Sequence, residues 1–299
     1  MKTQNLKFSL IIPTYNRPER LASCLAAIAQ SDYPRDRFEV IVVDDGSKTL
    51  LNSIVKPLQN KIQIKLLRQE NSGPAAARNY GAKMAQGKFL AFTDDDCQPL
   101  TNWLSQLAIS LEKTSEAMIG GQTINALVDN SYSTASQQLI DYIYEYYNRN
   151  QGKATFFASN NIAMAKSNFD RLGGFDVSFP LAAAEDRDFC DRWQQKYPML
   201  YVPQAQVKHY HQLSLTSFWR QHFGYGKGAF FFHQLRSQRA SKPMEVEPLS
   251  FYLDLLAYPL NHPSEQPRLL ISSLFLLSQV ANIMGFLREK LHKTLEFVS

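Results

Sequence analysis

The chain is predicted to be an α/β protein with a mostly parallel central sheet and helices on both faces. Short apolar runs rich in β-branched residues alternate with helical patterns, in units of roughly thirty residues. Polar clusters follow the apolar runs directly, and parallel sheets bind their ligands beyond the carboxyl ends of the strands. With 299 residues, 44% of them hydrophobic, the chain is long enough to bury one large core and an additional segment.

The first strand is predicted at residues 8–13, an apolar run that leads into a polar loop. A helix is predicted over about 19–30, because Leu21, Leu25 and Ile28 fall on one helical face. The same patterns predict the elements that follow, which are a strand at 38–43, a strand at 62–67, a helix at 75–85 and a strand at 88–93.

Three adjacent carboxylates, Asp94, Asp95 and Asp96, stand where the fourth predicted strand leaves the sheet. Like charges this close repel, and their burial requires a cation or strong hydrogen-bond donors. Mg²⁺ and Mn²⁺ favour oxygen ligands and share their coordination shell with substrate phosphates. A solvated acidic turn is the commoner structure for such a run. The neighbouring polar clusters favour a metal site that serves a diphosphate-bearing ligand.

Several motifs, taken together and in order, resemble the signature of family 2 glycosyltransferases. The resemblance covers residues 7–210 and implies a GT-A nucleotide-diphospho-sugar transferase fold with inverting, metal-dependent transfer of a sugar. The motifs are Ile-Ile-Pro13-Thr14-Tyr15-Asn16-Arg17, Val-Val-Asp44-Asp45-Gly46-Ser47, Gly73-Pro74-Ala-Ala-Ala-Arg78-Asn79, Phe92-Thr93-Asp94-Asp95-Asp96, Gly173-Gly174-Phe175-Asp176 and Glu185-Asp186.

The resemblance implies that Asp45 accepts a hydrogen bond from a ring N–H of uracil or thymine. For Asp44, a nucleotide contact and a strand-end Asx turn are both open. Arg78 is expected to bind the diphosphate, together with free N–H groups at the helix start marked by Gly73-Pro74. The alternative for Arg78 is a solvated surface position. The predicted nucleotide-binding residues are Pro13, Thr14, Tyr15, Asn16, Asp44, Asp45, Arg78, Asp94 and Asp95.

A divalent ion, Mn²⁺ or Mg²⁺, is the cofactor that the resemblance implies. The D-x-D pattern maps onto Asp94, on the ribose and metal side, and Asp96, the direct metal ligand, although three adjacent acids leave the register open by one. His211 is preferred over His209 as a further ligand, and an exposed loop position is the alternative. An imidazole ligand would favour Mn²⁺ over Mg²⁺.

The acidic pair Glu185-Asp186 follows an apolar stretch and precedes a helical pattern, which places it at a helix start. By the resemblance, Asp186 is the general base, and Glu185 orients the acceptor or the base. Helix capping by both acids is the alternative. Asp188 and Asp191 are expected to be charges on the helix surface.

Three residues are assigned to the sugar side of the site. Gly174, within a glycine pair, predicts a tight turn with positive φ, and Phe175 is expected to be a packed anchor that shapes the acceptor side. Asn161 is expected near the donor sugar by the resemblance, with a buried structural role as the alternative.

The catalytic domain is predicted at residues 1–212, with a nucleotide-binding half at 7–97 and an acceptor half at 98–212. A helical extension that associates with membranes is predicted at 213–299. The stretch 211–239, which begins just before this extension and is rich in aromatic and basic residues, is predicted either to lie at a membrane interface or to pack as a helix on the catalytic domain. A linker is predicted at 241–248. Residues 269–287 form a stretch of nineteen without a charge, but five polar residues favour an interfacial or partner-packing helix over a membrane span.

The predicted activity is transfer of a sugar from a nucleoside-diphosphate sugar, with UDP the expected nucleotide, to a hydroxyl of a glycan or lipid-linked acceptor. The alternatives are a non-catalytic carbohydrate- or nucleotide-binding relative and a nucleotidyltransferase, which would need a Gly-rich phosphate loop that residues 13–18 do not form. Three widely spaced cysteines and no leading apolar segment indicate the cytoplasm. A net charge of +5 agrees with peripheral contact at the inner face of the membrane, and no nucleic-acid-binding module is recognised.

Overall fold

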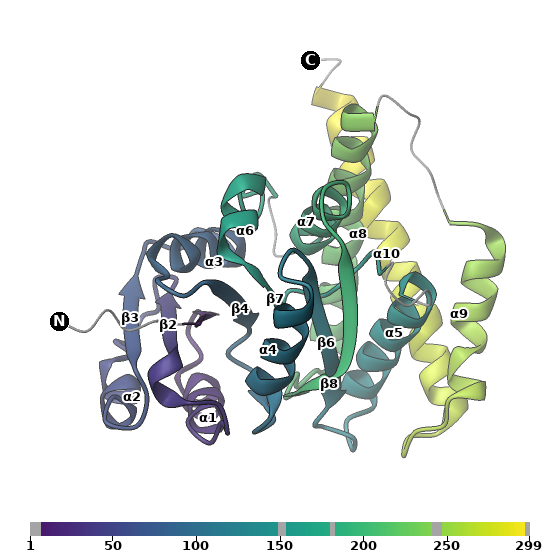
Figure 1. Ribbon diagram of the computed structural model, residues 1–299. Helices are drawn as coiled ribbons and strands as arrows, with labels where there is room; N and C mark the ends of the chain where they lie inside the picture. Colours follow the sequence, from purple (N-terminus) through teal and green to yellow (C-terminus); the bar gives the residue numbers. More distant parts are fainter. Residues whose placement is uncertain (1–6, 149–153, 180–182, 241–246, 297–299) are drawn as a thin grey trace. The chain divides into compact units, whose positions relative to one another are not determined.

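The computed structural model describes residues 7–148, 154–179, 183–240 and 247–296 (Figure 1). Most of the predicted linker at 241–248 lies outside these residues. The chain divides into two compact units, called here the sheet unit and the helical unit. The sheet unit contains Met1–Ile124, Asn148–Val177 and Phe189–Tyr210, and the helical unit contains Asn125–Tyr147, Ser178–Asp188 and His211–Ser299.

The sheet unit is built on one eight-stranded sheet in the order β3-β2-β1-β4-β7-β6-β8-β5. Strands β1 to β4 pair in parallel, whereas β7 pairs antiparallel with β4 and β6, and β5 pairs antiparallel with β8. The predicted parallel arrangement therefore applies to the first four strands, within a mixed sheet. The strands are β1 (Phe8–Thr14), β2 (Phe38–Asp44), β3 (Ile64–Arg68), β4 (Phe89–Thr93), β5 (Cys97–Pro99), β6 (Met118–Asn125), β7 (Asn161–Ala165) and β8 (Met199–His209).

The helices predicted over 19–30 and 75–85 and the four predicted strands are confirmed with ends shifted by two residues or fewer. In chain order the helices are α1 (Pro18–Ile28), α2 (Asn52–Val55), α3 (Gly73–Met84), α4 (Trp103–Lys113), α5 (Ser131–Tyr147), α6 (Lys166–Leu172), α7 (Glu185–Gln194), α8 (Leu215–Ala240), α9 (Leu249–Asn261) and α10 (Arg268–Glu296), with 3₁₀ turns at Arg35–Arg37 and Lys56–Leu58.

Strand β1 is buried on both faces, which explains its continuous apolar sequence. Leu10 and Ile12 belong to a core that includes Leu21 and Leu25 of α1. Ile11 points the other way, because its side chain lies under Gly81 of α3, where an added Cβ would be 2.6 Å from Ile11 Cγ2. Helices thus cover both faces of β1, and the polar residues that end the strand lie at the carboxyl end of the parallel strands.

The helical unit gathers α5, α8, α9 and α10 around a core of its own (Figure 1). Tyr142 of α5 packs edge-on against Tyr258 of α9 and donates a hydrogen bond to the carbonyl oxygen of Phe251 at 2.7 Å. Ile271 and Phe275 on the inner face of α10 are fully buried in the same cluster. The segment 211–239 thus forms most of a helix, α8, whose Phe218 contributes to this core.

Candidate functional site

The three adjacent carboxylates after β4 point to three different elements. Arg78 of α3 donates to Asp94 Oδ1 at 2.8 Å, and Thr14 of β1 donates to Asp95 Oδ2 at 2.7 Å. Asp96 Oδ1 lies 3.4 Å from Nε2 of His209 in β8. Asp95 and Asp96 are buried, so the alternative of a solvated acidic turn is wrong. The divergence separates Asp94 and Asp96, the two acids of the predicted D-x-D pattern, from the inward-facing Asp95.

Two arginines at the start of α1 neutralise the buried pair of acids. Arg17 Nη1 lies 3.2 Å from Asp95 Oδ1 and 3.5 Å from Asp96 Oδ2, and Arg20 Nη1 donates to Asp96 Oδ2 at 3.1 Å. Residues three apart lie on one side of a helix, so both guanidinium groups reach the same edge. Burial raises the pKa of Asp95 to about 6, although Arg17 and the hydroxyl of Thr14 lower it.

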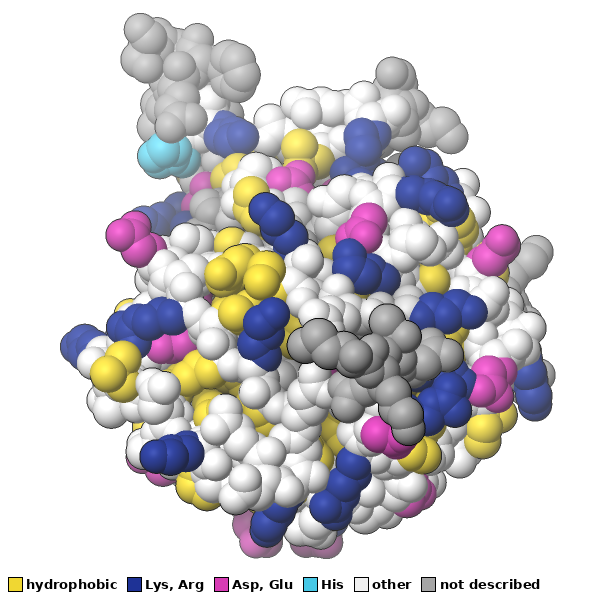
Figure 2. All heavy atoms as spheres, turned by 60° about the vertical axis from the view of Figure 1, so that its left-hand side comes forward, with side chains coloured by type: hydrophobic (Ala, Val, Ile, Leu, Met, Phe, Trp, Pro, Cys, Tyr) yellow, Lys and Arg dark blue, Asp and Glu magenta, His cyan; other side chains and the backbone are white. Residues whose placement is uncertain are grey.

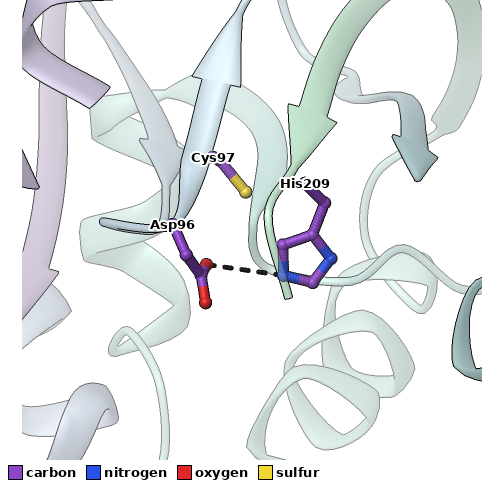
Figure 3. A group of neighbouring side chains, drawn as sticks. All are labelled: Asp96, Cys97 and His209. Carbon is purple, nitrogen blue, oxygen red and sulfur yellow. Dashed lines mark ion pairs between the residues drawn. The ribbon is translucent and has the colours of Figure 1, made fainter. Parts of the chain in front are cut away.

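Three side chains of types that can ligate a metal ion meet where β5 pairs with β8 (Figure 3). Cys97 faces His209 in the antiparallel register, and ligand atoms of Asp96, Cys97 and His209 lie within 4.8 Å of one another. A carboxylate with an imidazole suits Mn²⁺, and Mg²⁺ less well. Burial raises the pKa of the Cys97 thiol well above its usual range, and a neutral thiol is a poor ligand for a hard ion. Asp96 and His209 are therefore the donors that fit the implied divalent ion.

The preferred histidine of the sequence analysis, His211, belongs to the helical unit and is not a member of this group. Strand β8 ends at His209, so the alternation of side chains along a strand does not extend to residue 211. The role predicted for His211 stays untested, and His209 is the histidine beside Asp96.

Substitution Arg20→Gln is expected to raise the affinity of the nucleotide-free protein for Mn²⁺ by about two- to fivefold, the range of a partly exposed ion pair. The reason is that Arg20 occupies Asp96 Oδ2, an oxygen that a metal ion would use. Titration followed by the electron paramagnetic resonance of free Mn²⁺ measures this affinity. Arg35→Gln, which removes the same charge outside this cluster, is the control, and equal affinities for the two variants would contradict the prediction.

Arg78 is held in place by the glycine turn that follows α6. Its guanidinium lies 5.6 Å from the centre of the Phe175 ring, and Phe175 is buried. The neighbouring Asn79 donates to the carbonyl oxygen of Phe175 at 2.7 Å and accepts from its N–H at 2.9 Å. Gly173 and Gly174 have φ of 85° and 73°. The predicted turn and packed Phe175 are confirmed, and the alternative of a solvated Arg78 is wrong because Arg78 is buried.

Asp45 organises the loop that leads into α3. Its Oδ1 accepts from Gln69 Nε2 at 2.7 Å and from the N–H of Ser72 at 2.9 Å, and its Oδ2 accepts from Asn71 Nδ2 at 3.2 Å and from the N–H of Gly73 at 2.9 Å. These donors fill the acceptor positions of a carboxylate. A hydrogen bond from a nucleobase, the role predicted for Asp45, would require one donor to leave. The N–H groups of Ser72 and Gly73 are likewise engaged, which differs from the expected free helix start.

Asp44 closes a turn at the end of β2 with a hydrogen bond to the N–H three residues on, one residue further than in an Asx turn. Its Oδ1 accepts from the N–H of Ser47 at 2.9 Å, and Arg68 Nη1 donates to its Oδ2 at 3.0 Å. The carboxylate is buried at the end of β2. The turn explains Asp44 without a ligand, and its predicted nucleotide contact is untested.

The loop after β1 and the loop after β2 are joined by two hydrogen bonds. The N–H of Asn16 donates to Ser47 Oγ at 2.8 Å, and the N–H of Lys48 donates to Asn16 Oδ1 at 2.8 Å. Asn16 has a φ of 54°, a conformation that Asn tolerates better than most residues. Pro13 is buried, whereas Tyr15 is exposed and open to a stacking partner. A cavity of about 340 Å³ lies here, lined by Asn16, Pro18, Ser47, Lys48, Thr49 and Leu51.

Asn161 has a structural role at the start of β7. Trp103 Nε1 donates to its Oδ1 at 2.8 Å, and its Nδ2 donates to the carbonyl oxygens of Gln122 and Ala205, both at 3.0 Å. The side chain is fully buried. A contact with the donor sugar would require one of these bonds to break, so the packing alternative is the one that the geometry supports.

The start of α7, in the helical unit, carries the predicted base. Glu185 is buried, and Asp186 is half-buried with its Oδ1 accepting the N–H of Arg187 at 2.8 Å. Ala184, directly before the helix, has a φ of 71°. Among the described residues, Asn16 and Ala184 are the non-glycine residues with positive φ, and each lies in a segment predicted to be functional.

Two acids further along α7 differ from the prediction. Asp188 is fully buried and forms an ion pair with Arg239 of α8, and Asp191 is also buried. The expectation that both are helix-surface charges is wrong. The sequence gives no signal for this pair, because Asp188 and Arg239 are about fifty residues apart.

Surface charge is dispersed on the face of the molecule that Figure 2 shows. Basic and acidic side chains alternate there, and the described residues on this face form no large patch of one sign. The clustered charges of the sheet unit are instead the acids and arginines at the ends of β1 and β4.

Acids at the carboxyl ends of parallel strands lie where α/β sheets bind their ligands, and carboxylates together with substrate phosphates are the usual ligands of Mg²⁺. The model of the family "Glycosyl transferase family 2" matches residues 9–173, more than half of the chain, and the chain belongs to this family. It is 37% identical over 123 residues to the glycosyltransferase AglE of Haloferax volcanii, covering 40% of each chain. It is 30% identical over 224 residues to the hyaluronan synthase of Pasteurella multocida, covering 62% of this chain and 22% of that protein.

Solved structures show the same fold at low sequence identity. The mannosyltransferase PcManGT of Pyrobaculum calidifontis, in complex with GDP-Man and Mn²⁺, has a TM-score of 0.62 at 16% identity and matches 94% of this chain and 88% of its own. Residues 1–349 of S. aureus TarS, in complex with UDP-GlcNAc, have a TM-score of 0.54 at 17% identity, and the match covers 97% of this chain and 92% of the TarS chain. These likenesses confirm the predicted GT-A fold, with its helical extension after the sheet.

Proposed function

We propose that the protein is an inverting glycosyltransferase that moves a sugar from a nucleoside-diphosphate sugar, with UDP as the nucleotide, to a hydroxyl group of a glycan or lipid-linked acceptor. The observation that carries this proposal is the geometry around Asp94 and Asp96. Arg78 and His209 reach these two acids at one edge of the sheet. Such a set of one buried cation and two acids matches a diphosphate bridged by a divalent ion.

In the proposed reaction the sheet unit binds the donor. Arg78 is rigidly held and supplies a guanidinium to the diphosphate, on which negative charge develops as the sugar departs. The loop from Pro13 to Asn16 and the exposed ring of Tyr15 bind the nucleoside. A divalent ion held by Asp96 and His209 would neutralise charge on the diphosphate oxygens.

The proposed general base is Asp186. Its carboxylate takes the proton of the acceptor hydroxyl as that oxygen bonds to the anomeric carbon, and displacement from the face opposite the leaving diphosphate inverts the configuration. Glu185, the preceding residue, is buried, and its role is to orient the base or the acceptor. The left-handed conformation of Ala184 fixes the direction in which α7 begins.

Nucleotide binding tests the proposal. Calorimetric titration with UDP, dTDP, GDP, ADP and CDP, each with and without Mn²⁺, is expected to show binding of UDP that strengthens when Mn²⁺ is present. The panel includes GDP because PcManGT was solved with a GDP-sugar. The variant Arg78→Gln is expected to lose most of the affinity, while Arg35→Gln keeps it. Failure of all five nucleotides to bind would refute the transferase and favour a non-catalytic relative.

A further inference from the structure

Helix α10 presents an apolar stripe to solvent. Its exposed apolar side chains are between 42% and 77% accessible, and within the described part of the chain α10 is the one helix long and apolar enough to cross a membrane. With 3.6 residues per turn, all except Leu270 fall within about 100° of arc. The stripe consists of Leu269, Leu270, Leu276, Val280, Ile283, Met284, Leu287 and Leu291.

The opposite face of α10 is locked to α8, which excludes a bilayer-spanning position for the folded helix. A Cβ at Gly226 of α8 would lie 1.9 Å from the carbonyl oxygen of Asn282, and a Cβ at Gly285 would lie 2.0 Å from that of Phe223. The two backbones therefore pass at the closest approach that glycine allows. Lys227 and Glu289 add an ion pair of 2.7 Å between the helices. Extraction of α10 into a bilayer would break this interface and expose the core.

The charges beside the stripe select its partner. Arg268 lies exposed at the start of α10, and Arg288 and Lys290 lie exposed near its end. Glu289 is the one acidic residue among the described side chains of α10, and it forms an ion pair with Lys227 of α8 on the inner side of the helix. Two copies packed stripe to stripe would place like charges side by side, whereas anionic headgroups complement them.

We propose that the stripe of α10 is a membrane-docking surface that inserts its leucines and Ile283 at the headgroup–acyl boundary of an anionic bilayer, with the helix in the plane of the membrane. Exposed leucines on one face of α9, namely Leu249, Leu253 and Leu260, add apolar area to the same unit. The inference does not depend on the proposed reaction, because it uses no residue of the sheet unit. The sequence predicts peripheral contact with a membrane, and the stripe of α10 is the surface that we propose for this contact.

Co-sedimentation of the full chain with lipid vesicles tests the surface. Binding is expected with vesicles that contain phosphatidylglycerol, and weaker binding with vesicles of phosphatidylcholine alone. Ile283→Glu is expected to reduce binding by about tenfold or more. The matched control is Ile109→Glu on α4, an isoleucine 47% exposed compared with 58% for Ile283. Arg288→Gln with Lys290→Gln should remove the preference for the anionic lipid and leave the residual binding insensitive to salt.

Three outcomes would overturn the proposal. Equal loss in the two isoleucine variants would show that the stripe has no special role. A wild-type dimer in analytical ultracentrifugation that becomes a monomer with Ile283→Glu, without vesicle binding by either, would assign the stripe to a second copy. Retention in vesicles after alkaline carbonate extraction would indicate a spanning helix. Titration with UDP in the same variants separates failure of this surface from failure of the donor site.

Discussion

Substitution Asp186→Asn is expected to lower kcat by about 100-fold or more, the usual contribution of a general base. The amide is nearly the same size but cannot accept the proton of the acceptor hydroxyl. Binding of UDP with Mn²⁺ should stay within about twofold of wild type, because the predicted donor ligands lie in the sheet unit. Turnover is measured as release of UDP from the UDP-sugar, and affinity by calorimetry.

A matched control for this substitution is Asp170→Asn, which removes an exposed carboxylate paired with Lys166 on α6. This variant is expected to turn over as the wild type does. Turnover of Asp186→Asn like that of wild type would remove Asp186 from the role of base.

Asp96→Ala is expected to abolish the strengthening of UDP binding by Mn²⁺. In wild type we expect Mn²⁺ to increase the affinity about tenfold or more, and in the variant the ratio of the two dissociation constants should approach one. The carboxylate that reaches His209 is lost, and Arg20 loses its partner at the same time. Calorimetric titration of UDP with and without Mn²⁺ gives both constants directly.

Two histidine variants sharpen this test. His209→Ala should weaken the Mn²⁺ effect in part, because the geometry places its Nε2 3.4 Å from Asp96 Oδ1. His211→Ala should leave it unchanged. The reverse result would restore the ligand that the sequence pattern favoured, and an undiminished Mn²⁺ effect in Asp96→Ala would refute the metal assignment altogether.

Local sequence patterns were sufficient for the first half of the sheet. Strands β1, β2 and β4 are buried along their whole length, so each reads as a mainly apolar run, and acids at the ends of β2 and β4 mark where those strands end. The edge strand β3 is only partly buried. The glycine turn before Phe175 was also predictable, since a pair of glycines with positive φ has few alternatives. These features depend on residues that are neighbours in the sequence.

The missed features depend on contacts between distant segments. The closeness of His209 to Asp96 follows from the register of β5 on β8, which places Cys97 opposite His209 and which no local pattern encodes. Burial of Asp188 follows from its pairing with Arg239 on another helix. The pair Arg17 and Arg20 had a readable signal, because their spacing puts both on one side of a helix start beside the acids.

The pair of hydrogen bonds between Asn79 and Phe175 determines when, during synthesis and folding, the proposed donor site is completed. Arg78 is synthesised almost one hundred residues before the turn that supports it, so a nascent chain that has completed β1 to β4 still lacks the support of this arginine. Affinity for UDP should therefore emerge late and all at once, when β7 and α6 dock. Ligand affinity would then report on the integrity of the sheet unit as a whole, and a chain truncated before residue 175 would be expected to contain every acid of the D-x-D pattern and yet bind the nucleotide poorly.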